Sequence, residues 1–121
     1  MAKILIVDDS KAMRMIVMRA LRQAGLGTHK LVEAASGAEA LASSQAEKPD
    51  LILSDWNMPE MSGIELLRAL KAKGMGVKLG FVTSECTEEM QALAKQEGAV
   101  FFLSKPFTPE ALQAATTPHL C

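Results

Sequence analysis

Residues 3–24 read KILIVDDSKAMRMIVMRALRQA, an apolar run followed by two acids and then by an apolar pattern of a different period. Residues 4–7 are apolar without alternation, which is typical of a strand covered on both faces in a parallel sheet. Residues 10–24 repeat apolar side chains at helical spacing and stop at Gly25, which predicts an amphipathic helix. The stretch therefore predicts a strand leading directly into a helix, with Asp8 and Asp9 at the junction. The apolar stripe of this helix comprises Met13, Ile16, Val17, Ala20, Leu21 and Ala24.

The same alternation continues to the end of the chain. Further short apolar runs predict strands at residues 31–32, 51–53, 79–82 and 100–103. Helical patterns lie between these runs, with Ala38, Leu41 and Ala42, with Ile64, Leu67 and Leu70, and with Met90, Leu93 and Ala94. A last helix within residues 108–121 is short, poor in large apolar residues and interrupted by Pro118. We expect an α/β fold of five βα units, a doubly wound, flavodoxin-like parallel sheet in the order 2-1-3-4-5.

Length and charge restrict the classes of protein to which the chain can belong. Its 121 residues fit a single domain over residues 1–121, long enough to bury a core without disulfide or metal support. The net charge of −1, with acids and bases evenly scattered, argues against direct DNA binding. Two cysteines without a CxxC pair favour a reducing, cytoplasmic compartment. No uncharged apolar stretch approaches the length of a membrane span, so we expect no membrane association.

Acidic residues gather at two neighbouring strand ends of the predicted sheet. Asp8 and Asp9 follow the first strand and Asp55 follows the third, and these two strands are adjacent at the point where the winding direction reverses. Carboxylates about 5 Å apart repel by roughly 3 kcal/mol per pair at an effective dielectric near 20, so a cation is expected among them. Thr83 ends the fourth strand and Lys105 follows the fifth, which adds a hydroxyl and an ammonium. The set suits a hard cation such as Mg²⁺ shared with a phosphate group.

Each of these residues also has an ordinary structural interpretation. Asp8 and Asp9 could cap the first helix, since Asp is a favoured N-cap residue. Thr83 and Ser84 could cap the fourth helix, and Lys105 could simply be solvated. These interpretations do not explain why the polar residues converge on one edge of the sheet. The convergence favours a functional site.

Four motifs carry a resemblance to a known family. These are VDDSKAMRMIV at residues 7–17, SDWNMPEMSGIELL at residues 54–67, VTSE at residues 82–85 and KPFT at residues 105–108. The chain resembles a response-regulator receiver domain over nearly its whole length, and the chemotaxis regulators in particular. The resemblance implies a phosphorylation switch of two-component signal transduction, with slow loss of the phosphoryl group and no turnover as an enzyme.

The resemblance also implies roles for the acidic residues. Asp55 would accept a phosphoryl group from a partner histidine kinase and form an aspartyl phosphate. Asp9 and Asp55 would bind Mg²⁺ directly, Asp8 would bind it through water, and the backbone carbonyl of Asn57 would complete the protein ligands. Mn²⁺ could take the place of Mg²⁺.

The remaining roles concern the response to phosphorylation. Lys105 would pair with the phosphoryl group, and the hydroxyl of Thr83 would turn inward to meet it. Phe102 stands at the position of the switch aromatic, whose ring turns inward behind the threonine. The resemblance further implies a cis peptide bond between Lys105 and Pro106.

In receiver domains, the fourth helix, fifth strand and fifth helix form the face whose partner binding changes on phosphorylation. Chemotaxis members carry lysines near the start of the fourth helix, where this chain has Thr87, Glu88 and Glu89, and Phe102 replaces a tyrosine. The downstream target therefore stays open between a chemotaxis output, a phosphorelay intermediate and a phosphate sink without motor binding. The short last helix adds the hypothesis of phosphorylation-dependent self-association.

Three other functions are weighed against the receiver. A flavodoxin-like electron carrier would share the fold, but Asp8 and Asp9 would repel the flavin phosphate. An aspartate-nucleophile phosphohydrolase carries its two acids at alternate positions after the first strand, whereas here they are adjacent. An inert receiver-like scaffold is disfavoured because all of the expected site residues are present.

Overall fold

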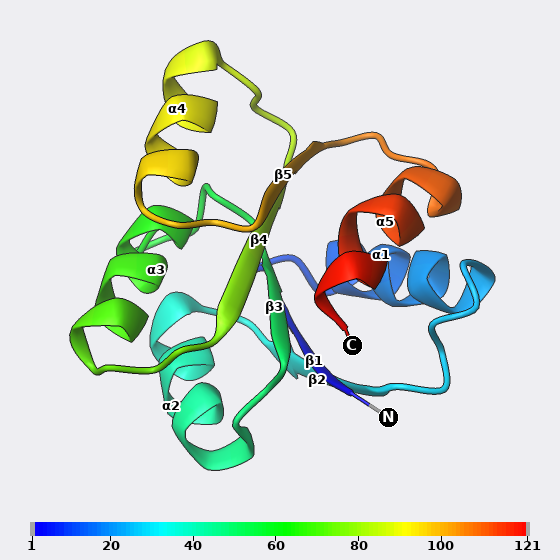
Figure 1. Cartoon of the computed structure of the whole chain (residues 1–121), viewed down its shortest axis with the longest axis horizontal. Helices are drawn as coiled ribbons and strands as arrows, with labels where there is room; N and C mark the ends of the chain where they lie inside the picture. Colours follow the sequence, from blue (N-terminus) through cyan, green and yellow to red (C-terminus); the bar gives the residue numbers. More distant parts are fainter. Residues whose placement is uncertain (1, 121) are drawn as a thin grey trace.

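The computed structural model describes residues 2–120 and has three layers, with a parallel sheet between two layers of helices (Figure 1). All neighbouring strands are parallel, and their order is β2-β1-β3-β4-β5. The predicted fold class and strand order are thus confirmed. The strands are β1 (Lys3–Val7), β2 (Lys30–Ala34), β3 (Leu51–Ser54), β4 (Lys78–Thr83) and β5 (Phe101–Ser104).

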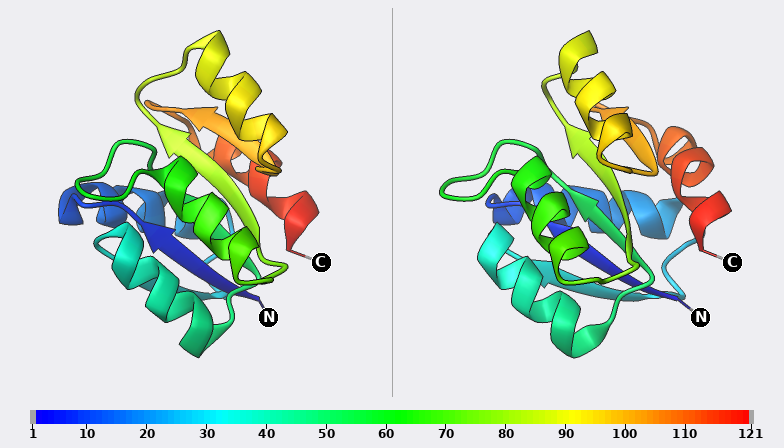
Figure 2. Two further views of the ribbon diagram at one scale, coloured as in Figure 1. Left: turned by 90° about the vertical axis from the view of Figure 1, so that its left-hand side faces the viewer. Right: turned by 60° about the vertical axis from the view of Figure 1, so that its left-hand side comes forward.

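Within residues 2–120, five α-helices alternate with the strands. They are α1 (Lys11–Gln23), α2 (Gly37–Glu47), α3 (Gly63–Ala72), α4 (Glu88–Gln96) and α5 (Pro109–Thr116), and a 3₁₀ turn at Thr117–His119 follows α5. Helices α1 and α5 cover one face of the sheet (Figure 1), and α2, α3 and α4 lie side by side on the other (Figure 2). The last helix has eight residues, as short as its sequence indicated.

The helix caps correct two sequence-based alternatives. The side chain of Ser10, not that of Asp8 or Asp9, accepts the N–H of Met13 and caps α1. Helix α4 is likewise capped by Thr87 and not by Thr83 or Ser84. The polar residues at the ends of β1 and β4 are therefore not used as helix caps.

The core lies on both faces of the sheet, and the central strands are the most deeply buried. Every residue of β3 and the last four residues of β1 are buried, because both strands have neighbours on each side and helices on each face. One position in the predicted stripe of α1 is wrong, since Ile16 is 51% exposed. The buried residues of that helix are Val17, Ala20 and Leu21.

Helix α2 also turns a different side to the core than its apolar residues suggested. Ala38 and Ala42 are exposed, Leu41 is half-buried, and Ala40 and Ser44 are buried. A helix composed mostly of alanine, serine and charged residues has little contrast between its sides, so its orientation is set by packing against α3 and the sheet.

The structure also bears on membrane spans and on the two cysteines. Among the described residues, no helix is long and apolar enough to cross a membrane. Cys86 is exposed in the loop between β4 and α4, and Cys121 lies outside the described residues.

Candidate functional site

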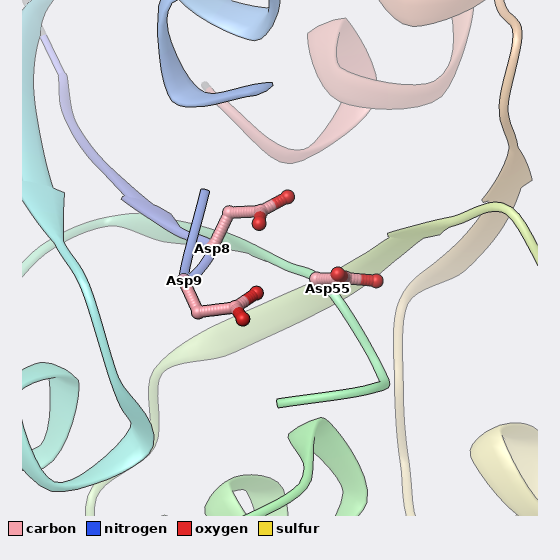
Figure 3. A group of neighbouring side chains, drawn as sticks. All are labelled: Asp8, Asp9 and Asp55. Carbon is pink, nitrogen blue, oxygen red and sulfur yellow. The ribbon is translucent and has the colours of Figure 1, made fainter. Parts of the chain in front are cut away.

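Three carboxylates converge at the carboxyl ends of β1 and β3. The side chains of Asp8 and Asp9 extend toward the side on which Asp55 lies (Figure 3), and the three offer oxygens that all lie within 4.8 Å of one another. The sheet register produces this proximity, because Val7 pairs with Ser54 and the N–H of Asp55 donates to the carbonyl of Val7 at 2.9 Å. The acidic cluster expected from the sequence is therefore formed by the two central strands.

Asp8 is the most deeply buried of the three acids, at 4% exposure. Its Oδ1 accepts the N–H of Ser10 at 2.9 Å, and its Oδ2 accepts the ammonium of Lys105 at 3.1 Å. Its backbone carbonyl accepts the guanidinium of Arg14 at 2.7 Å. These contacts fix the carboxylate at the start of the loop, whereas Asp9 is exposed and faces solvent.

The backbone around Asp55 is tightly packed. Its Oδ1 accepts the N–H of Trp56 at 2.8 Å, and its backbone carbonyl accepts the hydroxyl of Ser54 at 2.8 Å. The N–H of Gly63, the first residue of α3, donates to the carbonyl of Trp56 at 2.8 Å. A Cβ at Gly63 would overlap the carbonyl oxygen of Asp55, so only glycine fits there. Gly63 was not among the predicted site residues, and its one signal in the sequence is its position directly after the helix cap Ser62.

Lys105 places its charge between two of the acids. Its Nζ lies 3.1 Å from Asp8 Oδ2 and 3.9 Å from Asp55 Oδ2. Burial raises the pKa of Asp55, the charge of Lys105 opposes this change, and the charge of Asp8 adds to it. The cluster therefore carries more negative charge than one lysine neutralises, which favours binding of a further cation.

Thr83 and Phe102 lie beside the acidic cluster on β4 and β5. Thr83 is fully buried at the end of β4, and its hydroxyl accepts the N–H of Glu85 at 3.4 Å. Burial raises the pKa of Asp55, and the nearby hydroxyl of Thr83 slightly opposes this rise. Phe102 is half-buried, with its ring centroid 6.2 Å from those of both Trp56 and Phe81. The centroids of Trp56 and Phe81 are 4.8 Å apart. A continuous set of rings thus links the β5 surface to the residue after Asp55.

Two further predicted features of the site are the Lys105–Pro106 peptide bond and the position of Asn57. The peptide bond between Lys105 and Pro106 is cis, as the resemblance implied. Asn57 is exposed in the loop after β3, two residues beyond Asp55. No hydrogen bond in the described part of the chain joins its side chain to the acids.

A family model and two related proteins match most of the chain. A family model described as response regulator receiver domain matches residues 4–117. The chemotaxis protein CheY of Pseudomonas aeruginosa is 40% identical over 115 residues, covering 92% of this chain and 90% of that protein. A CheY homolog of Campylobacter jejuni is 36% identical over 114 residues, covering 92% of this chain and 86% of that protein.

Solved structures show the same likeness. The structure of Vibrio cholerae chemotaxis protein CheY4 superposes with a TM-score of 0.87 at 38% identity and covers 99% of both chains. The receiver domain of the putative response regulator NarL from Mycobacterium tuberculosis gives a TM-score of 0.85 at 28% identity, covering 97% of this chain and 94% of that one.

A parallel sheet that holds three acids against one lysine at its switch point is consistent with the phosphorylation site of a signalling domain. The chain belongs to the response regulator receiver domain family. It is a receiver domain of two-component signalling similar to the chemotaxis CheY proteins, and a phosphorylation switch rather than a turnover enzyme. Asp8, Asp9 and Asp55 form the acidic triad typical of the Mg²⁺ site of receivers. The resemblance stated from the motifs is confirmed.

Proposed function

We propose that Asp55 accepts a phosphoryl group from a histidine kinase in a Mg²⁺-dependent reaction, and that this changes partner binding at the face formed by α4, β5 and α5. One observation carries the proposal. The partly buried carboxylate of Asp55 lies 3.9 Å from the ammonium of Lys105 and within 4.8 Å of oxygens of Asp8 and Asp9. Family membership supplies the class of donor, since receiver domains imply a cognate histidine kinase.

The transfer is an attack of one Asp55 oxygen on the phosphorus of a phosphohistidine. The new O–P bond forms as the P–N bond breaks, and the imidazole nitrogen keeps the electron pair and takes a proton. An ionised carboxylate needs no general base, and its handicap is repulsion by the phosphoryl oxygens. Catalysis therefore consists mainly of positioning and charge neutralisation.

The donor set fits Mg²⁺, because three carboxylates within 4.8 Å are hard oxygen ligands with excess negative charge. Asp8, Asp9, Asp55 and the backbone carbonyl of Asn57 would hold the ion, and Mn²⁺ could replace it. When bound, the ion supplies neutralisation of the phosphoryl oxygens. Lys105, which contacts two acids in this structure, would exchange one of these contacts for a phosphoryl oxygen.

The switch is proposed to begin at Thr83 and Phe102. A phosphoryl group on Asp55 offers strong acceptors to the hydroxyl of Thr83, which is buried at the end of the neighbouring strand. Movement of Thr83 changes the space available to Phe102, whose strand pairs with β4. The packing of Phe102 against Trp56 would then alter, and with it the surface between α4 and β5.

The output is open between two proposals. The 40% identity to a chemotaxis CheY favours a chemotaxis output. The acids Glu88 and Glu89 in the first turn of α4 favour a phosphorelay intermediate or phosphate sink without motor binding. Incubation of the phosphorylated chain with a second histidine-containing protein separates a relay intermediate from both a chemotaxis output and a phosphate sink, since only a relay intermediate passes its label onward.

Labelling with acetyl phosphate in the presence of Mg²⁺ tests the proposal. We expect labelling of the wild-type chain, none of Asp55→Asn, and much slower labelling of Lys105→Ala. Lys73→Ala is the matched control, since Lys73 is an exposed lysine at the end of α3, outside the site. Wild-type labelling of Asp55→Asn would refute the assignment of the acceptor.

A further inference from the structure

Charge is unevenly distributed between the first part of the chain and the α4–β5–α5 face. After Lys78 the sequence contains only two lysines, Lys95 and Lys105, and no arginine, against five glutamates. Lys105 belongs to the acidic site, and Glu97 pairs with basic residues of α3. The glutamates that are exposed are Glu85, Glu88, Glu89 and Glu110. Four exposed acids against one lysine make the face strongly negative.

An apolar groove opens on this face between α4 and β5. Its volume is about 500 Å³. Small side chains of α4 form one wall, and half-buried Phe101 and Phe102 contribute apolar surface from β5. The lining residues are Gln91, Ala92, Ala94, Lys95, Ala99, Val100, Phe101 and Phe102.

Lys95 is the one charged residue among those that line the groove, and two acids of α4 precede the lining residues in the first turn of the helix. Glu88 lies one helical turn before Gln91 and Ala92 and therefore on the same side of α4. Glu89 is its exposed neighbour in the first turn. Lys95 stands at the opposite end of the same side, two turns further on. Two exposed acids therefore lie next to the groove at its end near the loop after β4, and apolar side chains of α4 and β5 line its length.

Building on the proposed function, we propose that the output partner is a protein segment with bulky apolar side chains flanked by lysine or arginine. The apolar side chains would fill the groove beside Ala92 and Phe102, and the basic groups would meet Glu88 and Glu89. Such complementarity speeds encounter and disfavours acidic segments, which Glu88 and Glu89 would repel.

The groove is linked to the proposed phosphorylation site through two aromatic residues, Phe102 and Trp56. Phe102 lines the groove and packs on Trp56, whose N–H donates to Asp55 Oδ1 at 2.8 Å. A rearrangement of Phe102 would therefore change the shape of the groove. The affinity for the basic segment is expected to differ between the phosphorylated and unphosphorylated chain.

A pair of synthetic peptides tests this inference. One is a short amphipathic helix with leucines on one side flanked by lysines, and the other carries glutamate in place of each lysine. Binding is followed by amide chemical shifts of the ¹⁵N-labelled chain at low salt, with and without acetyl phosphate and Mg²⁺. Mass spectrometry of the same samples reports phosphorylation separately, so failure of labelling is distinguished from failure of binding.

We expect the lysine peptide to shift residues of α4 and β5 and the glutamate peptide to leave them unchanged. The double variant Glu88→Gln and Glu89→Gln should weaken binding by about two- to thirtyfold, the range for two surface ion pairs. The same change at Glu39, in the first turn of α2 on a distant helix, should have no effect. Equal or tighter binding of the glutamate peptide, shifts away from α4 and β5, or a protein that forms dimers without peptide would overturn the proposal.

Discussion

Asp9→Asn should make the metal-free protein more stable and the Mg²⁺-bound protein less so. Asp9 offers an oxygen within 4.8 Å of those of Asp8 and Asp55. Within the described residues, the ammonium of Lys105 pairs with those two acids and no ion pair reaches Asp9. Removing the charge of Asp9 therefore relieves repulsion that the protein itself does not neutralise.

The magnitude follows from the distance between the carboxylates. Two unit charges 4.8 Å apart repel by about 0.9 kcal/mol in bulk water and about 3.5 kcal/mol at an effective dielectric of 20. Because Asp9 is exposed, the lower value applies to each of its two pairs. The free energy of unfolding should rise by about 1–2 kcal/mol, which is about 4–8 °C in Tm for a chain of this size.

Thermal melts followed by circular dichroism, first in a chelator and then in excess Mg²⁺, measure this effect. Wild-type Tm should rise with Mg²⁺ by linkage, and the variant should gain less because it lacks one ligand. Glu60→Gln is the matched control, since Glu60 is an exposed acid outside the cluster. A lower Tm of Asp9→Asn in the chelator would contradict the electrostatic explanation.

Three further predictions concern other parts of the chain. Gly63→Ala should destabilise the fold by about 1–3 kcal/mol in urea titrations and slow labelling, because the added Cβ would overlap the carbonyl oxygen of Asp55. A variant as stable as the wild type would show that α3 shifts without cost. The pKa of Glu47 is lowered by its hydrogen bond and charge interaction with Lys3, so the stability this gives is present above pH 4.5 and lost as the pH falls through the lowered pKa. Glu47→Gln should flatten the dependence of Tm on pH across that range, and an unchanged slope would count against the contact. Addition of Mg²⁺ should change the fluorescence of Trp56, since its N–H donates to Asp55, and a silent titration would place the ion elsewhere.

The sequence predicts the central part of the fold well because its signals are local and strong. The continuous apolar runs at β1, β3 and β4 arise because these strands are covered on both faces. The edge strand β2 has only one neighbouring strand, and its sequence contains only two large apolar residues, Leu31 and Val32. The predicted strand was therefore shorter than the observed one, which extends from Lys30 to Ala34. An edge strand tolerates exposed charged residues, so a search for runs of apolar residues does not detect the ends of the strand.

The candidate site is predictable because strand order converts sequence positions into neighbours. Once β1 and β3 are adjacent, Asp8 and Asp55 must lie at one edge of the sheet. The features that the sequence did not predict depend on contacts between elements that are far apart in the chain. The approach of Gly63 to Asp55 and the exposure of Ile16 follow from how α3 and α1 lie on the sheet, and local periodicity does not encode that placement.

The most direct measurement is the position of the phosphoryl group. After incubation with acetyl phosphate and Mg²⁺, reduction by borohydride converts an aspartyl phosphate to homoserine, which peptide mass spectrometry locates. We expect a single modified residue, Asp55, and no modification when Mg²⁺ is removed by a chelator. Modification at Asp8, at Asp9 or outside the acidic cluster, or labelling that persists without a divalent cation, would contradict the proposed switch.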